Sequence, residues 1–290
     1  YRTQRRGGRG ISGVARKDED FVEDMFITST HDYVLFFTNR GKMYRMKGYE
    51  IPETGRAARG SHVVNLLPIE KDEKISAMIR VDEVENDSYL VMVTRNGTIK
   101  RTALSAYRNV RKGGIIAINL EEGDELAWVR NTTGEDDLII ATRQGVAIRF
   151  AESDVRPMGR TATGVRAIRL DEGDEVIAMA TCEEGGYLLT VTENGQGRRT
   201  ALGEYRTQNR GGRGVRNYDC EGKGTLVAGV RVVGEEDDVI LIADDGIIIR
   251  IPCKQIAVQS RYGGGVHAMR LEEGSRVVAL ARAPREEDDE

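Results

Sequence analysis

Apolar and polar positions alternate along this 290-residue chain in short runs that recur about every fifty residues. Each recurrence starts with an apolar, largely β-branched run, passes through a glycine turn and ends in a second run that closes on arginine. These segments span residues 34–45, 90–101, 138–149, 188–199 and 240–250. Asn-Gly and Asp-Gly between such runs favour tight β-turns, because both residues tolerate positive φ. The pattern predicts five β-hairpins, and no stretch carries the 3.6-residue spacing of an amphipathic helix.

Two further elements run in phase with the hairpins. A long basic, glycine-rich loop follows each hairpin, and an acidic turn lies between apolar stretches at residues 120–126, 170–176 and 271–277. Each unit therefore contains a hairpin, a basic loop, a strand, an acidic turn and a last strand. One four-stranded sheet of this size cannot bury both faces, whereas units stacked radially can. We expect an all-β, six-bladed, propeller-like disc of four-stranded blades.

The unbroken repeat predicts a single domain over residues 1–285. Its units lie near 1–23, 24–81, 82–131, 132–182, 183–233 and 234–285, and an acidic tail follows at 286–290. The first unit has a basic loop but no hairpin before it. We therefore expect an incomplete first blade, in a chain that begins in mid-unit and is a piece of a longer protein.

The clearest repeat is a ten-residue segment. Positions 1–10 recur at 205–214 with one difference, Arg5 against Asn209. Both copies set arginines among glycines, which let the backbone approach a ligand closely, and a guanidinium can bind phosphate with two parallel hydrogen bonds. The shorter frame Arg-x-x-x-Gly stands at 6–10, 56–60, 160–164, 210–214 and 261–265, while residues 110–114 are basic but shifted by one position.

Net charge is −4, which alone argues against a nucleic-acid partner, but the charges are unevenly distributed. Without the five acidic residues of the tail, 43 basic residues face 42 acidic ones. Acidic clusters occupy the short turns and basic clusters the long loops, so identical orientation of all units makes one edge of the disc basic. Arginine outnumbers lysine 34 to 9, which favours bidentate phosphate contacts.

The basic loops supply the residues that we predict to contact DNA. These are Gln4, Arg5, Arg6, Gly7, Gly8, Arg9, Gly10, Arg56, Arg59, Arg111, Lys112, Arg160, Gln208, Arg210, Gly211, Gly212, Arg213, Gly214 and Arg261.

Other chemistry finds little support in the sequence. Cys182, Cys220 and Cys253 are far apart and lack the spacing of a zinc site, so we expect free, buried thiols. The three histidines are isolated, and no nucleophile lies in a recognisable catalytic pattern. Residues 8–13 fit G-x-G-x-x-G, but without a preceding strand and a following helix they do not indicate a dinucleotide site. No apolar run is long enough to span a membrane.

The segment Gln-Arg-Arg-Gly-Gly-Arg-Gly at 4–10 and the stretch 28–41 resemble the family of DNA gyrase A C-terminal domains, whose hallmark is this box. The resemblance implies a six-bladed β-pinwheel with strands exchanged between neighbouring blades. It also implies that DNA, bound without regard to sequence, wraps around the rim with positive handedness. That wrap lets the full enzyme introduce negative supercoils at the expense of ATP.

The same resemblance implies the setting of the chain. The domain is expected to catalyse nothing by itself and to hold no cofactor or metal, since ATP and magnesium act elsewhere in the full enzyme. Its expected partners are double-stranded DNA, the rest of gyrase A, and gyrase B in an A2B2 assembly. The isolated domain is expected to be a monomer, with no membrane partner, in the bacterial cytoplasm at the nucleoid.

Three alternatives stay open. The C-terminal domain of the topoisomerase IV paralogue shares the architecture, although its box is usually degraded. A protein-binding kelch-type propeller has a similar period, but it predicts blades richer in aromatic residues, and Trp128 is the single tryptophan. An RGG-type RNA-binding segment predicts a chain without strand periodicity.

Overall fold

The structure is a computed structural model, and it describes residues 11–12, 32–51, 66–81 and 87–283. Five hairpins form in this part of the chain, as the alternating pattern predicts. Their paired strands are β2 (Tyr33–Thr38) with β3 (Lys42–Lys47), β5 (Tyr89–Thr94) with β6 (Thr98–Ala103), β9 (Asp137–Thr142) with β10 (Val146–Ala151), β13 (Tyr187–Thr192) with β14 (Gln196–Ala201), and β17 (Asp238–Ala243) with β18 (Ile247–Pro252).

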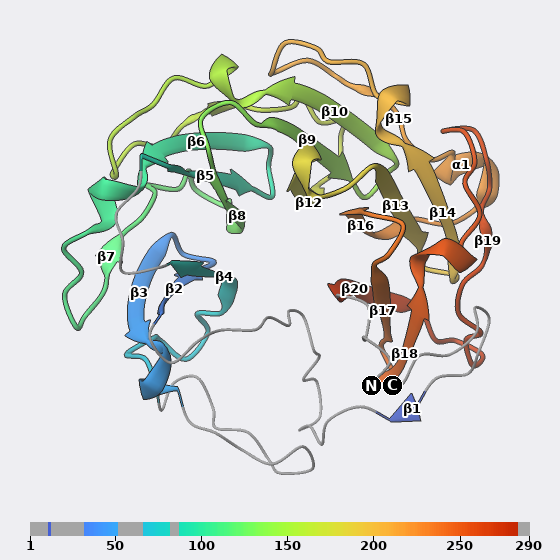
Figure 1. Ribbon diagram of the computed structural model, residues 1–290, viewed down its shortest axis with the longest axis horizontal. Helices are drawn as coiled ribbons and strands as arrows, with labels where there is room; N and C mark the ends of the chain where they lie inside the picture. Colours follow the sequence, from blue (N-terminus) through green and yellow to red (C-terminus); the bar gives the residue numbers. More distant parts are fainter. Residues whose placement is uncertain (1–10, 13–31, 52–65, 82–86, 284–290) are drawn as a thin grey trace.

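Each hairpin is the centre of a four-stranded antiparallel sheet, and the sheets follow one another around a ring (Figure 1). An inner strand pairs with the first strand of each hairpin. The inner strands are β4 (Ile75–Val81), β8 (Leu126–Thr132), β12 (Val176–Thr181), β16 (Val227–Val233) and β20 (Val277–Ala283). The predicted all-β fold of four-stranded, propeller-like blades is thereby confirmed.

The fourth strand of each sheet is a two-residue outer strand taken from another unit. These strands are β7 (Ile115–Ile116) on β3, β11 (Val165–Arg166) on β6, β15 (Val215–Arg216) on β10, and β19 (Val266–His267) on β14. The last sheet receives β1 (Ile11–Ser12), whose Ile11 pairs with Ile248 of β18. Neighbouring blades therefore exchange strands, and the first basic loop leads into the outer strand of the last blade.

The expected number of six blades is corrected here: the described residues form five sheets. The sequence holds six basic loops but only five hairpins, and every sheet is built around a hairpin. The one strand described in the first unit, β1, does not belong to an incomplete blade of its own, because it completes the sheet of β17 and β18.

The turn of each hairpin fixes the next unit in place. The carbonyl of Gly145 accepts hydrogen bonds from the amides of Asn217 and Tyr218, at 2.7 and 3.0 Å, and Gly41, Gly97 and Gly195 each accept an equivalent pair. Gly145 has φ +93°, and a Cβ on it would lie 2.1 Å from the carbonyl oxygen of Tyr218. Glycine is required there both by backbone conformation and by close approach.

Helices contribute little to the described part. A four-residue α1 (Cys220–Lys223) precedes β16, and short 3-10 turns lie at η1 (Gly48–Glu50), η3 (Leu104–Tyr107), η4 (Glu152–Asp154), η5 (Cys182–Glu184), η6 (Leu202–Glu204) and η7 (Cys253–Gln255). Among the described residues no helix has the length and apolarity needed to cross a membrane.

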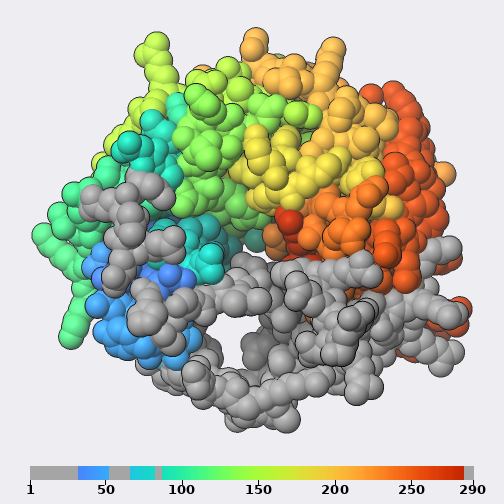
Figure 2. Space-filling view, viewed as in Figure 1, coloured from blue at the N-terminus to red at the C-terminus, as the bar shows by residue number. Residues whose placement is uncertain are grey.

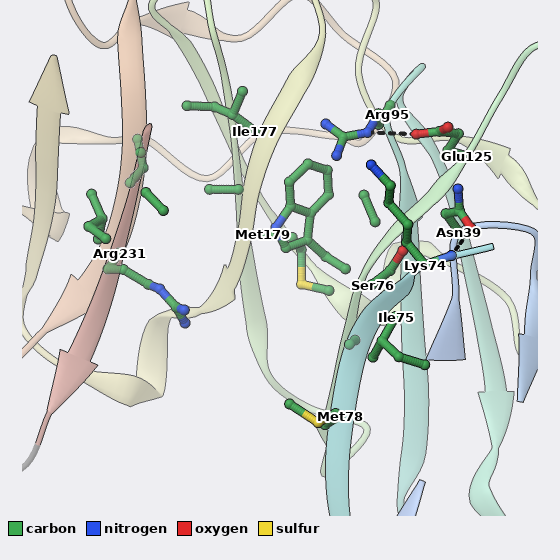
Figure 3. Close-up of a pocket in the computed structure, with 18 of the residues that line it drawn as sticks. Asn39, Lys74, Ile75, Ser76, Met78, Arg95, Glu125, Ile177, Met179 and Arg231 are labelled. Carbon is green, nitrogen blue, oxygen red and sulfur yellow. Dashed lines mark hydrogen bonds and ion pairs between the residues drawn. The ribbon is translucent and has the colours of Figure 1, made fainter. Parts of the chain in front are cut away.

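Most of the hydrophobic core lies between blades, and smaller clusters lie within the first and last described sheets. One cluster joins Val91 and Ile99 of one sheet to Ile140 and Phe150 of the next, and similar clusters fill the other boundaries. In the space-filling view the described units follow in sequence order around the disc (Figure 2). The inner strands face a central cavity of about 960 Å³, which Ile75 of β4 and Met179 of β12 help to line (Figure 3). The outer strands therefore lie at the opposite, peripheral edge of each sheet.

Candidate nucleic-acid interface

Four described loops run along the periphery and end in the outer strands. These rim loops are residues 104–116, 152–166, 202–216 and 253–267. Together they contain twelve lysines and arginines and three carboxylates. The acidic turns lie elsewhere: Glu125 and Asp72 line the central cavity, and Glu125 pairs with Arg95 of a hairpin turn there (Figure 3). Basic and acidic segments of one unit thus occupy opposite ends of its sheet.

Besides Arg108 and Arg111, five further arginines on the rim loops are exposed: Arg156, Arg166, Arg206, Arg213 and Arg216. Among the described residues, no carboxylate lies within ion-pairing distance of these five, hereafter the rim arginines. An exposed guanidinium without a carboxylate partner keeps its donors and its charge available to an anion from solution.

The arginines of the Arg-x-x-x-Gly frame, hereafter the frame arginines, are held differently. Each of the three that the structure describes donates a hydrogen bond to the carbonyl of the last residue in the preceding outer strand. Arg160 bonds to Ile116, Arg210 to Arg166 at 3.0 Å, and Arg261 to Arg216 at 2.7 Å. These side chains therefore tie successive rim loops together, and part of their donor capacity is already used within the protein.

A third set of arginines closes each hairpin. These latch arginines, each the fourth residue of its second hairpin strand, are Arg45, Arg101, Arg149, Arg199 and Arg250. Four of them donate to a carbonyl in the next unit's rim loop, at Arg108, Val155, Leu202 and Ile256, over 2.7 to 3.1 Å. They join one blade to the next.

The partner of each latch arginine on its own sheet lies twelve residues earlier, at the first position of the hairpin. It is either a tyrosine or an aspartate. Tyr33, Tyr89 and Tyr187 place their rings 4.6 to 5.0 Å from the guanidinium, whereas Asp137 and Asp238 form ion pairs at 3.0 and 2.9 Å. At this one structural position, three hairpins therefore have a cation–π contact and two have an ion pair.

The loop at 110–114 requires a correction. The sequence suggests that its frame is shifted by one residue, but Gly114 occupies the same place as Gly164, Gly214 and Gly265, all with positive φ before an outer strand. The frame is in register, and Val110 replaces the arginine. Val110 packs against the core cluster of its blade boundary, so an apolar contact replaces the tie between loops.

The predicted contact residues divide into three described groups and a fourth that the structure does not describe. Arg111, Lys112 and Arg213 are exposed on rim loops, and Arg160, Arg210 and Arg261 serve as frame arginines. Gln208, Gly211, Gly212 and Gly214 shape one loop, where the Gly211 amide donates to the Ala167 carbonyl at 2.6 Å. The residues that lie outside the described part are Gln4, Arg5, Arg6, Gly7, Gly8, Arg9, Gly10, Arg56 and Arg59, together with the acidic tail.

Four of the five rim arginines were missed from sequence. Arg156 and Arg206 are fifty residues apart, and so are Arg166 and Arg216. That repeat spacing was the available signal, because positions related by one period lie at equivalent places in successive blades. The prediction considered only the residues of the Arg-x-x-x-Gly frame and left out the arginines on either side of it.

The cysteines carry no reactive site. Cys182, Cys220 and Cys253 are free and buried, as predicted, and burial raises the pKa of their thiols to about 12, 11 and 12. A thiol with so high a pKa is a poor nucleophile at neutral pH. No group of three or more potential metal ligands occurs among the residues that the structure describes.

Comparison with known proteins gives a consistent result. The family model described as "DNA gyrase C-terminal domain, beta-propeller" matches six segments, at residues 1–29, 32–82, 88–133, 136–183, 186–233 and 237–284. The DNA gyrase A protein of Halalkalibacterium halodurans is 57% identical over 289 residues, and that of Clostridium acetobutylicum is 51% identical over 290. Each match covers 100% of this chain but 35% of the relative, so the chain spans about a third of their length.

Two solved structures resemble the fold closely. A DNA gyrase A C-terminal domain matches with a TM-score of 0.85 at 26% identity, covering 98% of this chain and 93% of that one. The C-terminal domain of a DNA topoisomerase IV matches with a TM-score of 0.82 at 29% identity, covering 93% and 84%. Structure alone does not separate the two paralogues, whereas the sequence relatives named above are gyrase A proteins.

Proposed function

The chain belongs to the family of DNA gyrase C-terminal domains, and we propose on that premise that it binds double-stranded DNA along its rim and wraps it. The observation that carries the proposal is the set of exposed rim arginines without carboxylate partners in the described part of the chain, repeated at blade spacing on two adjacent rim loops. Each is a candidate phosphate contact, and successive contacts on a curved rim hold a bent duplex.

Binding of this kind is expected to be independent of sequence. Reading base edges in the major groove requires a helix or a two-stranded ribbon that fits the groove. The outer strands of the rim have two residues each and are paired to their own sheets. Arginines on such loops reach phosphate oxygens, which fix the position of a duplex without reading its sequence.

The wrap has to overcome the stiffness of DNA. Bending 20–30 base pairs through 40–90° costs on the order of 1–6 kcal/mol, so several rim contacts must act together. Each neutralised phosphate releases counterions, and the affinity should fall with salt at a slope of about −0.9 per contact. Flexible sequences should wrap more readily than stiff ones.

In the full enzyme we propose that the wrap, of positive handedness, presents DNA for the introduction of negative supercoils. The chain would then contribute no catalytic group, and ATP and magnesium would be used in other parts of the assembly. Its partners would be the rest of gyrase A, and gyrase B, in an A2B2 complex at the bacterial nucleoid. The relatives' gyrase A identity supports this assignment over a kelch-type protein-binding role.

The test is a topology assay with the chain as it stands. A nicked plasmid is ligated in its presence, and the linking number of the product is measured on gels over a salt series. The double variant Arg213→Ala with Arg216→Ala should reduce the linking-number change and lower the salt slope by about 1–2 units.

A matched control removes two positive charges away from the rim. Arg95 and Arg276 are exposed but ion-paired with Glu125 and Glu193. The variant Arg95→Ala with Arg276→Ala should leave the linking-number change intact. Equal loss in both double variants would show that net charge, not the rim, controls binding, and no linking-number change with the unaltered chain would contradict the proposal.

A further inference from the structure

Two cations are fully buried directly beneath rim loops. Lys100 of β6 and Arg198 of β14 are each the third residue of a second hairpin strand, and both side chains are 0% exposed. The same position in the other hairpins holds Tyr44, Ile148 and Ile249. A buried charge needs compensation by a partner charge or by hydrogen bonds, so these two positions call for an explanation.

Both cations bind the carbonyl of a frame arginine in the next unit. Nζ of Lys100 donates to the carbonyls of Arg160 and Ala117. Nη1 of Arg198 donates to the carbonyls of Arg261 and Gly263, at 3.0 and 2.9 Å. Among the described residues, neither side chain forms an ion pair with a carboxylate. Within that part of the chain, the dipoles of carbonyl and amide groups balance the two charges.

A rim loop with an aliphatic side chain beneath it is built in another way. Ile148 lies under residues 208–214, and a Cβ built on Gly212 would lie 3.9 Å from its Cδ1. There the glycines carry the shape: Gly211 has φ +83°, and its amide donates to the Ala167 carbonyl. In the loop at 160–164, by contrast, Thr161, Ala162 and Thr163 stand between the frame arginine and its glycine. In that loop the buried cation, instead of glycines, holds the backbone in place.

We propose that Lys100 and Arg198 are positioning residues for phosphate binding, which hold the carbonyls of the rim loop inward and place behind it a positive charge that no described carboxylate neutralises. The inference rests on the proposed DNA-binding function. A phosphate on the outside of the loop is the anion that such a charge attracts. That attraction is stronger through the protein interior than through water, because the interior screens charge less.

Lys100 makes this inference testable by pH. The groups that face its ammonium are Arg160 from the rim loop and Tyr107 from η3, whose ring centroid lies 5.9 Å from Nζ. Burial, with a smaller contribution from Arg160, lowers the pKa of Lys100 to about 7. Burial raises the pKa of Tyr107 to about 12, so the phenol stays neutral near pH 7. Lys100 is charged below its pKa, and a bound phosphate favours the charged form. DNA should therefore bind more tightly at pH 6 than at pH 8.5, with proton uptake.

The experiment measures affinity for a short DNA duplex by fluorescence anisotropy from pH 6 to 8.5 at fixed salt. The unaltered chain should lose affinity by about threefold to tenfold over this range, since one unit of pKa change corresponds to a factor of ten. Lys100→Arg, which stays charged, should bind without that loss, and Lys100→Met should bind weakly at every pH. His267 on the rim is present in every variant, so ratios between variants isolate the change at Lys100.

Lys112→Met is the matched control, because Lys112 is an exposed lysine on a rim loop. It should lower affinity and salt slope but keep the pH profile of the unaltered chain. Hydrogen exchange of amides 158–164 without DNA gives a second readout: exchange should rise in Lys100→Met and not in Lys100→Arg.

Identical pH profiles for the unaltered chain and Lys100→Arg would overturn the proposal, and so would unchanged exchange in a folded Lys100→Met. If Lys100→Met does not fold, the profile of Lys100→Arg decides alone. Failure of the unaltered chain to bind DNA would contradict the proposed function instead, while the exchange experiment would still test whether Lys100 fixes the loop.

Discussion

The latch arginines and the rim arginines are the same residue type in opposite surroundings. Arg250 of the latch set is paired with Asp238 at 2.9 Å, with both side chains largely buried. Arg213 and Arg216 of the rim set are exposed and have no carboxylate partner among the described residues. Four members of the first set join one blade to the next, and all five are paired within their own hairpin, whereas the second set is free to meet an external anion. Position in the repeat, not residue type, decides between a structural and a binding role.

The largest expected loss of stability follows from removing a latch arginine. Arg250→Ala leaves Asp238, which is 2% exposed, with a buried carboxylate that has lost its guanidinium. Removing one partner of a buried ion pair typically destabilises a protein by about 3–5 kcal/mol. Urea unfolding followed by circular dichroism should show a loss of that size. A second change, Asp238→Val in the same chain, should restore part of it, because no unpaired charge then remains. A midpoint equal to that of the unaltered chain would refute the stabilising role of the Arg250–Asp238 pair.

A smaller effect is expected from exchanging the two kinds of latch partner. The ring of Tyr33 lies 4.9 Å from Arg45 and 5.6 Å from Lys47. Tyr33→Leu keeps apolar area but removes the cation–π contact, and should lower the free energy of unfolding by about 0.5–1 kcal/mol. Tyr33→Asp should be the more stable of the two at low salt and lose that advantage near 1 M salt, where ion pairs are screened. If Tyr33→Asp is the less stable at low salt, tyrosine and aspartate are not equivalent there.

The smallest effect on stability is expected at the rim. Arg213→Ala with Arg216→Ala removes two exposed side chains, and neither is hydrogen-bonded through its guanidinium to a described residue. The free energy of unfolding should therefore change by less than about 0.5 kcal/mol, as for ordinary surface substitutions. Thermal melts of this variant and of the unaltered chain should coincide. A shift of several degrees would assign these arginines a structural role like that of the latch.

Much of the fold was predictable because the hairpins carry a strong local pattern. Alternating residues on both sides of Asn96-Gly97 or Asn194-Gly195 predict a hairpin without any long-range information. The exchange of strands was not visible in the same way, since a two-residue strand such as Val165–Arg166 is too short to carry a periodicity. It was expected only from the family resemblance. The number of blades was overestimated because the basic loops were counted instead of the hairpins.

The candidate site was predicted in part for a similar reason. The Arg-x-x-x-Gly frame identifies Arg160, Arg210 and Arg261, but sequence does not show that their guanidiniums bond to carbonyls of a neighbouring loop. The sequence shows the latch arginines as residues that end a strand, but it does not indicate what they contact. Their constant separation of twelve residues from a tyrosine or aspartate gains meaning only from the hairpin register, which sets the two on one face of the sheet.

Strand exchange also determines when each strand edge can pair as the polypeptide is synthesised. The edge of β3 stays unpaired until Ile115 and Ile116 have been synthesised, some seventy residues later. At about 5–20 residues per second, that wait is roughly 4–14 seconds, during which an open strand edge can pair with a wrong neighbour. The edge of β18 has the opposite history, because its partner β1 is made first and waits for almost the whole chain. The last blade is therefore completed by the strand that precedes all the others in the described part of the chain.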